Sequence, residues 1–323
     1  MFSLYPIWDI VTTQLAVLSI FMTSSKGKQI VTIFLTVAQI VTPVFALAAI
    51  GYLWVQMKIE YDVEFVTCVT MTISTPCLIF SALTHTEIPP QALRDISVAA
   101  FLSYGGLLTL FAIGLWLRGF DLRTYLGPLV FGNTGNLGLP LALFAFGDEG
   151  FGYAVVVFAI MAILSFSIGV WIVAGGGSPL KIIKEPLVGA TLLGGVFLVF
   201  DWSVPPVVDN TVSLLGQMAI PLMLITLGVA LARLTPSDTW EAIKLSVIKA
   251  AVTFVLPLWV GLYFDLPAIA LAVLVIQVAT PVPVTSYLLA RKYEANSDKV
   301  AGLVVVSTLL SVAYLPLMLA YFL

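Results

Sequence analysis

Charge, histidine and cysteine are all scarce in this chain of 323 residues, and each shortage excludes a class of protein. Only 10% of the residues are Asp, Glu, Lys or Arg, whereas soluble domains carry about 25%. The Lys and Arg residues form no basic run, so nucleic acid is not an expected partner. A single His cannot build a metal site, and no metal or cofactor is expected. Cys68 and Cys77 share one apolar stretch and are expected to pack there without a disulfide.

Apolar residues dominate instead, and the bilayer is the expected surrounding. Hydrophobic residues make up 60% of the chain, and the mean hydropathy is +1.10. Because a charge in the membrane centre is costly, the charged residues divide the chain into runs that can be compared with the roughly 20 residues needed to span. The runs predict ten transmembrane helices: Ile30–Val55, Phe65–Thr84, Ile96–Leu117, Thr124–Phe146, Tyr153–Val173, Pro186–Phe200, Thr211–Ala232, Leu245–Phe264, Pro267–Leu289 and Val300–Leu323.

The distribution of Lys and Arg predicts the orientation. Eleven of these residues fall on one side of a ten-helix topology, and Lys26, Lys28 and Arg94 fall on the other. The positive side should be cytoplasmic, which puts the C-terminus outside a plasma membrane, or an inner membrane if the cell is Gram-negative. Lys249 lies near the end of its run and is expected to snorkel to the interface rather than to serve as a substrate counter-ion. Residues 1–29 are expected to lie along the interface, with an eleventh span as the alternative.

Ten helices divide into two groups of five, and an odd number per group makes the second run opposite to the first. The predicted fold is therefore an all-α membrane protein with two inverted five-helix repeats, residues 30–173 and 186–323, joined by a cytoplasmic linker, residues 174–185. A shift of 143 positions places Pro43 on Pro186 and Pro140 on Pro283, which supports the repeat modestly.

The fourth and ninth predicted helices contain residues that break helices. The fourth carries Asn133, Thr134, Gly135, Asn136, Gly138 and Pro140, and the ninth carries Gln277, Thr280, Pro281, Pro283, Thr285 and Ser286. Proline and glycine both weaken a helix, and a broken helix survives in a membrane only where it faces protein or a water-filled cavity. We therefore expect the two helices to unwind near the midplane and to cross there.

A crossing of this kind predicts an anion site. The amino ends of half-helices carry partial positive charge, and seven polar side chains are the predicted substrate-binding residues: Asn133, Thr134, Asn136, Gln277, Thr280, Thr285 and Ser286. The alternative is that small and hydroxyl residues only allow close helix packing. For Pro76 and Pro221 in the second and seventh helices, packing kinks and pocket lining stay equally open.

These motifs resemble those of a known family. Asn-Thr-Gly-Asn-Leu-Gly-Leu-Pro at 133–140, Thr280-Pro281, Thr-Ser-Tyr-Leu-Leu-Ala at 285–290 and Ser-Thr-Leu-Leu-Ser at 307–311 are similar to the auxin efflux carriers. That family includes plant PIN-FORMED proteins and bacterial malonate and malate permeases. The resemblance covers residues 30–323. This chain lacks the long cytoplasmic loop of the plant members, and Val282-Pro283 departs from the residues that often follow the first proline.

The resemblance implies a particular mechanism. Helices 1, 2, 6 and 7 would form a scaffold that can form a homodimer, and the other helices would form a transport domain that moves like an elevator. Asn133 would contact a substrate carboxylate, and Pro140 and Pro281 would be the crossover prolines.

The expected function is thus a secondary transporter that exports a small organic anion such as a carboxylate. None of the 17 Asp and Glu residues falls inside a predicted span, which favours a uniporter over a proton-driven carrier. A sodium-coupled or proton-coupled symporter stays open, and an anion channel is the more remote alternative. A membrane enzyme is not expected, because no nucleophile and base, carboxylate pair or metal cluster is recognisable.

Overall fold

Every regular element in the part of the chain that the structure describes is a helix. The structure is a computed structural model, and it describes residues 25–85, 88–176, 186–200, 202–234 and 239–323. Seven helical stretches within these ranges are long and apolar enough to cross a membrane. The protein is therefore an all-α, multi-pass membrane protein. Most of the predicted interfacial segment and of the predicted linker, residues 1–24 and 177–185, lies outside the described residues.

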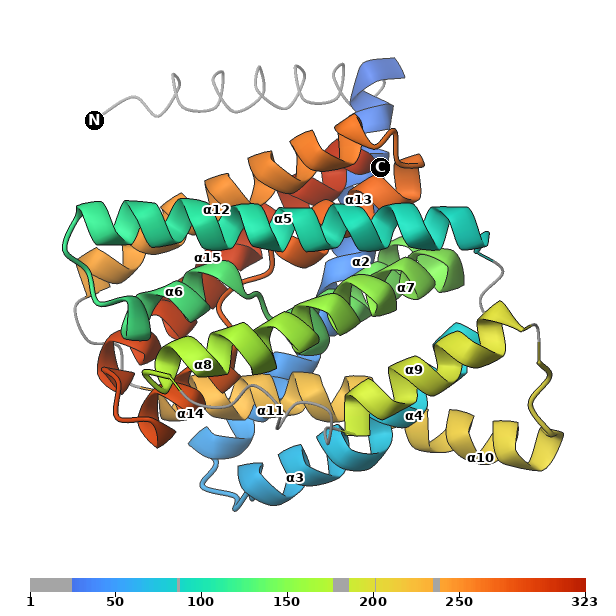
Figure 1. Cartoon of the computed structure of the whole chain (residues 1–323), viewed down its shortest axis with the longest axis horizontal. Helices are drawn as coiled ribbons and strands as arrows, with labels where there is room; N and C mark the ends of the chain where they lie inside the picture. The colour runs from blue at the N-terminus through green and yellow to red at the C-terminus, as the bar shows by residue number, and fades with distance from the viewer. Residues whose placement is uncertain (1–24, 86–87, 177–185, 201, 235–238) are drawn as a thin grey trace, which may run out of the picture.

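The helices follow one another with short connections (Figure 1). In chain order they are α2 (Ser25–Gln56), α3 (Val63–Val69), α4 (Thr75–Thr84), α5 (Pro90–Leu117), α6 (Leu122–Val130), α7 (Leu139–Leu164), α8 (Val170–Val173), α9 (Pro186–Val199), α10 (Pro206–Gln217), α11 (Ala219–Arg233), α12 (Thr239–Tyr263), α13 (Ala268–Val278), α14 (Val284–Lys292) and α15 (Ser297–Phe322). Three π-helical turns join some of them: η1 (Thr70–Ser74), η2 (Thr134–Gly138) and η3 (Ser165–Gly169).

The seven stretches differ from the ten predicted spans for local reasons. The fourth and fifth predicted spans are contained in one stretch of 52 residues, Leu122–Val173, which bends sharply at Gly147, where φ is 62°. The sixth corresponds to α9, which has 14 residues and is short for a span. The ninth is divided between α13 and α14. The ten-span topology therefore stays a prediction.

Proline explains why two of the π-helical turns occur where they do. Pro76 and Pro140 each stand at the beginning of an α-helix, directly after η1 and η2. Proline has no N–H to donate and its ring clashes with the carbonyl four residues earlier. The wider π turn accommodates this clash and leaves backbone carbonyls without their usual partners. Such turns occur often at functional sites.

Polar residues begin several of the helices. Asp62 accepts a hydrogen bond from the N–H of Phe65 at the start of α3, and Asn296 accepts one from Lys299 at the start of α15. Asp121 caps α6 in the same way. These side chains satisfy N–H groups that have no partner within the helix. They lie in connections between apolar runs, as their charge or polarity predicts.

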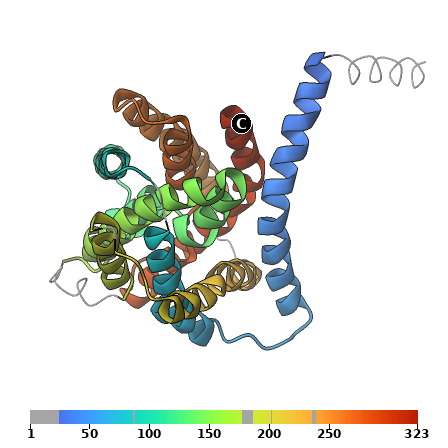
Figure 2. The ribbon, with the colours of Figure 1, turned by 90° about the vertical axis from the view of Figure 1, so that its right-hand side faces the viewer.

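Two pairs of distant helices pack closely around small residues. Helix α2, the long helix along one side of the molecule in Figure 2, lies against α11, and α4 lies against α9. A Cβ atom at Gly228 of α11 would overlap the carbonyl oxygen of Ala48, and one at Gly51 of α2 would overlap that of Ile225. Glycine lets the two backbones approach each other, as is common between membrane helices. Cys68 and Cys77 are free thiols; Cys77 is half-buried, whereas Cys68 is exposed and does not pack inside the protein as expected.

We expect Gly228→Ala to lower the melting temperature of the detergent-solubilised protein. The added methyl group meets backbone rather than a flexible side chain, and overpacking of this kind costs about 1–3 kcal/mol. Gly114→Ala in α5 is the matched control, because nothing lies within 4 Å of its Cβ position. Equal melting temperatures for the two variants would contradict the close approach of α2 and α11.

Candidate anion site at the crossing of two broken helices

The first broken segment lies between α6 and α7. Helix α6 ends at Val130, residues 131–133 are not helical, and the chain resumes a helical path at η2. The second broken segment lies between α13 and α14, where residues 279–283 are not helical. Both interruptions fall where the Gly, Asn and Pro residues predict them. We call residues 131–138 and 277–283 together the crossover.

The two broken segments contact each other directly. The N–H of Asn133 donates to the carbonyl of Pro281 at 2.7 Å. A Cβ atom at Gly132 would overlap the hydroxyl oxygen of Thr280, and one at Gly138 would overlap the amide oxygen of Gln277. Glycine at both positions therefore lets the segments lie this close without displacing the side chains of Thr280 and Gln277.

Side chains of the last helix satisfy other backbone groups of the crossover. The N–H of Val282 donates to Oγ of Ser307 at 3.0 Å, and the hydroxyl of Tyr314 donates to the carbonyl of Ala279 at 2.9 Å. Without these two bonds, the N–H of Val282 and the carbonyl of Ala279 would be buried in an apolar surrounding without partners, which is costly. Helix α15 thus stabilises the non-helical conformation of the second broken segment.

Three of the predicted site residues carry polar groups that are buried and unpartnered. They are the amide nitrogen of Asn133, the hydroxyl of Thr134 and the whole amide of Gln277, and none has a hydrogen-bond partner among the described residues. Asn133 is 4% exposed, and Thr134 and Gln277 are fully buried. Buried polar groups in proteins almost always have partners, so an unpartnered cluster requires an explanation such as a ligand.

Two other predicted residues open into a neighbouring pocket. Asn136 of η2 and Thr285 of α14 line a small pocket. Its opposite wall consists of residues from α3, η1 and α11: Val63, Thr67, Thr70, Met71, Met223, Thr226 and Leu227. The hydroxyl of Thr70 is itself buried and unpartnered.

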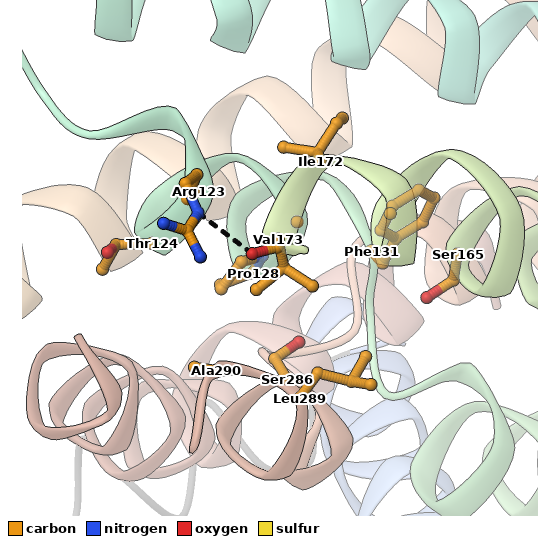
Figure 3. A pocket seen from close by; sticks show the side chains of 12 residues that line it. Arg123, Thr124, Pro128, Phe131, Ser165, Ile172, Val173, Ser286, Leu289 and Ala290 are labelled. Carbon is orange, nitrogen blue, oxygen red and sulfur yellow. Dashed lines mark hydrogen bonds between the residues drawn. The ribbon is translucent and has the colours of Figure 1, made fainter. Parts of the chain in front are cut away.

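Ser286 faces the other side of α14. It lines a second small pocket with Arg123, Phe131 and Ser165 (Figure 3). The guanidinium of Arg123 donates to the carbonyl of Val173 at 3.1 Å, the bond drawn in Figure 3, and to that of Tyr293 at 2.8 Å. The seven predicted residues therefore do not share one cavity: Asn136 and Thr285 line one pocket, and Ser286 lines another.

The remaining predicted residues lie in the crossover or, for Pro140, directly after it. The Thr280 hydroxyl donates to the carbonyl of Gln277 at 2.7 Å. A Cβ atom at Gly135 would come within 3.0 Å of the Phe158 ring. Pro140 begins α7 and Pro283 precedes α14, while the carbonyl of Pro281 accepts the bond from Asn133.

The expectation for Lys249 is wrong. Its side chain does not reach the interface, because the residue is 1% exposed. Its ammonium instead donates to the carbonyls of Leu129, at 3.1 Å, and Phe131, at 3.5 Å. These carbonyls are free because α6 stops at Val130. Position within the apolar run suggested snorkelling, but the broken helix beside α12 offers acceptors much closer than the interface.

Sequence reasoning also missed part of the pocket wall. Thr67 and Thr70 belong to the second predicted helix and were not among the predicted residues, whereas Thr226, five residues after Pro221, was an open candidate for pocket lining. The signal that could have found them is the presence of hydroxyl residues on the helix within about three turns of Pro76. Near Pro221, Thr226 lines the pocket while Gly228 packs against α2, so pocket lining and close packing both occur there.

Comparisons with known proteins find membrane transporters. Residues 176–319 match the model of a family described as membrane transport proteins. An "Uncharacterized transporter" of Methanothermobacter thermautotrophicus is 25% identical over 300 residues, which is 88% of this chain and 98% of that protein. A "Putative malonate transporter" of Rhizobium meliloti is 25% identical over 301 residues, covering 85% of this chain and 92% of that protein. These matches confirm the resemblance drawn from the motifs, and they are to membrane transporters rather than to enzymes.

We expect Ser307→Ala to destabilise the protein although it removes only one oxygen atom. The substitution leaves the N–H of Val282 buried without its acceptor, which costs about 1–3 kcal/mol, and the melting temperature should fall accordingly. Thr109→Ala is the control, because the Thr109 hydroxyl is exposed and bonds only within its own helix. An unchanged melting temperature for Ser307→Ala would show that α15 does not support the crossover.

Proposed function

We propose that the protein is a uniporter that exports a small organic anion, with a carboxylate as the recognised group, by elevator-type alternating access across the plasma membrane. The observation that carries the proposal is the cluster of buried, unpartnered amide and hydroxyl groups at the crossing of two broken helices. The relatives support transport as the function, and the printed name of one of them suggests malonate as the first substrate to test.

The geometry of the crossover favours an anion. The helical run that begins at Thr134 and the helix that begins at Val284 both start at the crossover. Their first N–H groups lack partners within the helix and carry partial positive charge. The nearby amide nitrogens of Asn133 and Gln277 can donate to carboxylate oxygens. This combination suits a carboxylate better than a neutral solute.

The helix packing supports two inverted repeats. Two repeats of five helices make the first predicted helix equivalent to the sixth, and the second equivalent to the seventh. A contact between the first and seventh helices should therefore have a counterpart between the sixth and second. These two contacts are α2 with α11 and α4 with α9. Likewise, the contact of α5 with α7 corresponds to that of α12 with α15. We therefore propose the ten-helix division, with repeats over residues 30–173 and 186–323.

The position of the pocket supports an elevator. One wall belongs to α3, η1 and α11, which pack among the proposed scaffold helices, and the other belongs to η2 and α14 in the proposed transport domain. A site on the boundary between two such groups can be carried from one side of the membrane to the other when one group slides. We further propose that the scaffold forms a homodimer and that the C-terminus lies outside.

The buried charges favour uniport. The buried polar and charged side chains of the described residues include Lys249 but no Asp or Glu. A proton-coupled carrier is expected to bury a carboxylate that titrates during transport. Sodium coupling through backbone carbonyls is the alternative, and an anion channel is less consistent with polar groups gathered at one depth.

We expect purified protein to be stabilised by malonate in a thermal-shift assay and to catalyse malonate counterflow in proteoliposomes. Asn136→Ala and Asn133→Ala should each lower the affinity for malonate about tenfold or more, because a hydrogen bond to a charged group contributes about 1.5–3 kcal/mol. Asn210→Ala is the matched control, since that asparagine is exposed on α10. Full malonate binding by both variants would place the site elsewhere.

We expect the flux to respond to voltage rather than to ion gradients. An inside-negative potential of 100 mV favours outward movement of each negative charge by about 2.3 kcal/mol. Malonate efflux from proteoliposomes should therefore rise when a potassium diffusion potential is imposed and should not require a sodium or proton gradient. Efflux that stops when both gradients are removed, at constant potential, would contradict uniport.

A further inference from the structure

The broken helices expose carboxyl ends as well as amino ends. Helix α6 ends at Val130 and helix α13 ends at Val278, and both ends lie at the crossover. The last carbonyls of a helix have no partner within it and carry partial negative charge. In a broken membrane helix such carbonyls are the groups that can bind a sodium ion. What occupies these two ends therefore bears on whether the carrier needs a cation.

Lys249 occupies the carboxyl end of α6. Its ammonium bonds to the carbonyls of Leu129 and Phe131, and the side chain is almost completely buried between α12 and α6. No carboxylate of the described residues forms an ion pair with it. Its partners are thus neutral carbonyl dipoles, and the bonded carbonyl of Phe131 precedes Asn133 by only two residues.

Neutral hydroxyl groups occupy the carboxyl end of α13. Tyr314 donates to the carbonyl of Ala279, and Thr280 donates to that of Gln277. The two ends are alike in that donors of the chain itself bond to some of their carbonyls. They differ in that only the end of α6 receives a charged group.

We infer that the Lys249 ammonium takes the place of a co-transported cation at the carboxyl end of α6. Its positive charge compensates the negative charge of the substrate carboxylate. The inference rests on the proposed function, since it concerns the anion held at the same crossover. Lys249 acts as a positioning and charge-compensating residue through the α6 carbonyls, and it is not placed in contact with the substrate. At the other carboxyl end, hydroxyl donors bond to the carbonyls of Gln277 and Ala279. The positive charge at the crossover is therefore that of Lys249 and does not depend on a sodium ion.

The burial of Lys249 couples its charge energetically to that of a bound anion. A buried ammonium without a carboxylate partner is costly, because carbonyl dipoles replace only part of its hydration. An anion bound nearby offsets that cost through Coulomb attraction, which is strong where water is excluded. The same attraction raises the affinity for the anion. The effect should therefore grow with the charge of the ligand, whereas a purely structural role would weaken all ligands equally.

The experiment compares two ligands of nearly the same shape and different charge. Malonate carries two negative charges near neutral pH, and its half-amide, malonamate, carries one. Binding of both is measured by thermal shift and calorimetry on the purified full-length protein, in sodium buffer and in choline buffer. The variants are Lys249→Gln, which keeps a donor but removes the charge, and Lys249→Arg, which keeps the charge.

We expect Lys249→Gln to lose about tenfold more affinity for malonate than for malonamate, as for unit charges on the order of 10 Å apart at an effective dielectric constant of about 20. Lys249→Arg should show no such difference between the ligands. Lys244→Gln is the matched control, since Lys244 lies on the same helix and stacks over Trp240. Tyr314→Phe removes a neutral donor and should affect both ligands by the same factor.

The outcomes separate this inference from the proposed function. If the wild-type protein binds neither ligand, the carboxylate carrier fails and Lys249 has no anion to compensate. If it binds both and Lys249→Gln weakens them equally, Lys249 is only a structural donor or an uncharged amine, and the inference alone is wrong. A wild-type protein that binds malonate in sodium buffer but not in choline buffer would equally overturn it.

Discussion

A backbone that leaves its helical path inside a membrane must find hydrogen-bond partners within the protein, because lipid offers none. The centre of this molecule is organised by that requirement. Asn133 bonds to Pro281 across the two broken segments, Ser307 and Tyr314 bond to the second segment, and Lys249 bonds to the first. Helices α12 and α15 are therefore tied to the crossover by polar contacts, in addition to their apolar packing.

The same close approach creates the candidate site. Gly132 and Gly138 let the two segments touch, and this contact buries Gln277 and Thr134 without giving their polar groups partners. A tightly packed apolar crossing would be more stable, since unpartnered buried amides are costly. The cost is understandable if a polar solute completes the hydrogen bonds during transport. Asn136 and Thr285 extend the polar surface into a pocket whose far wall belongs to other helices.

Charge is distributed unevenly around this centre. Carboxylates lie toward the ends of the helices, as in the ion pair of Glu241 with Lys299 at 3.2 Å, while a lysine is buried beside the crossover. Among the described residues, a lysine is buried near the crossover but no carboxylate is. This imbalance makes the membrane centre attractive to anions. Together with the amino ends of two half-helices, this arrangement gives a consistent physical basis for carrying a carboxylate.

The amino-acid sequence alone determined the membrane environment, the all-helical class and the positions of the two breaks, because hydropathy and the Gly, Asn and Pro residues act locally along the chain. It did not determine which polar residues share a cavity. Ser286 and Thr285 are neighbours in α14 but face different pockets. Thr67 and Thr70 line the pocket of Thr285 although they belong to a distant part of the chain. It also misplaced Lys249, whose acceptors lie more than one hundred positions earlier in the chain. Only tertiary packing decided these points, since a side chain's partners depend on which helices lie beside it.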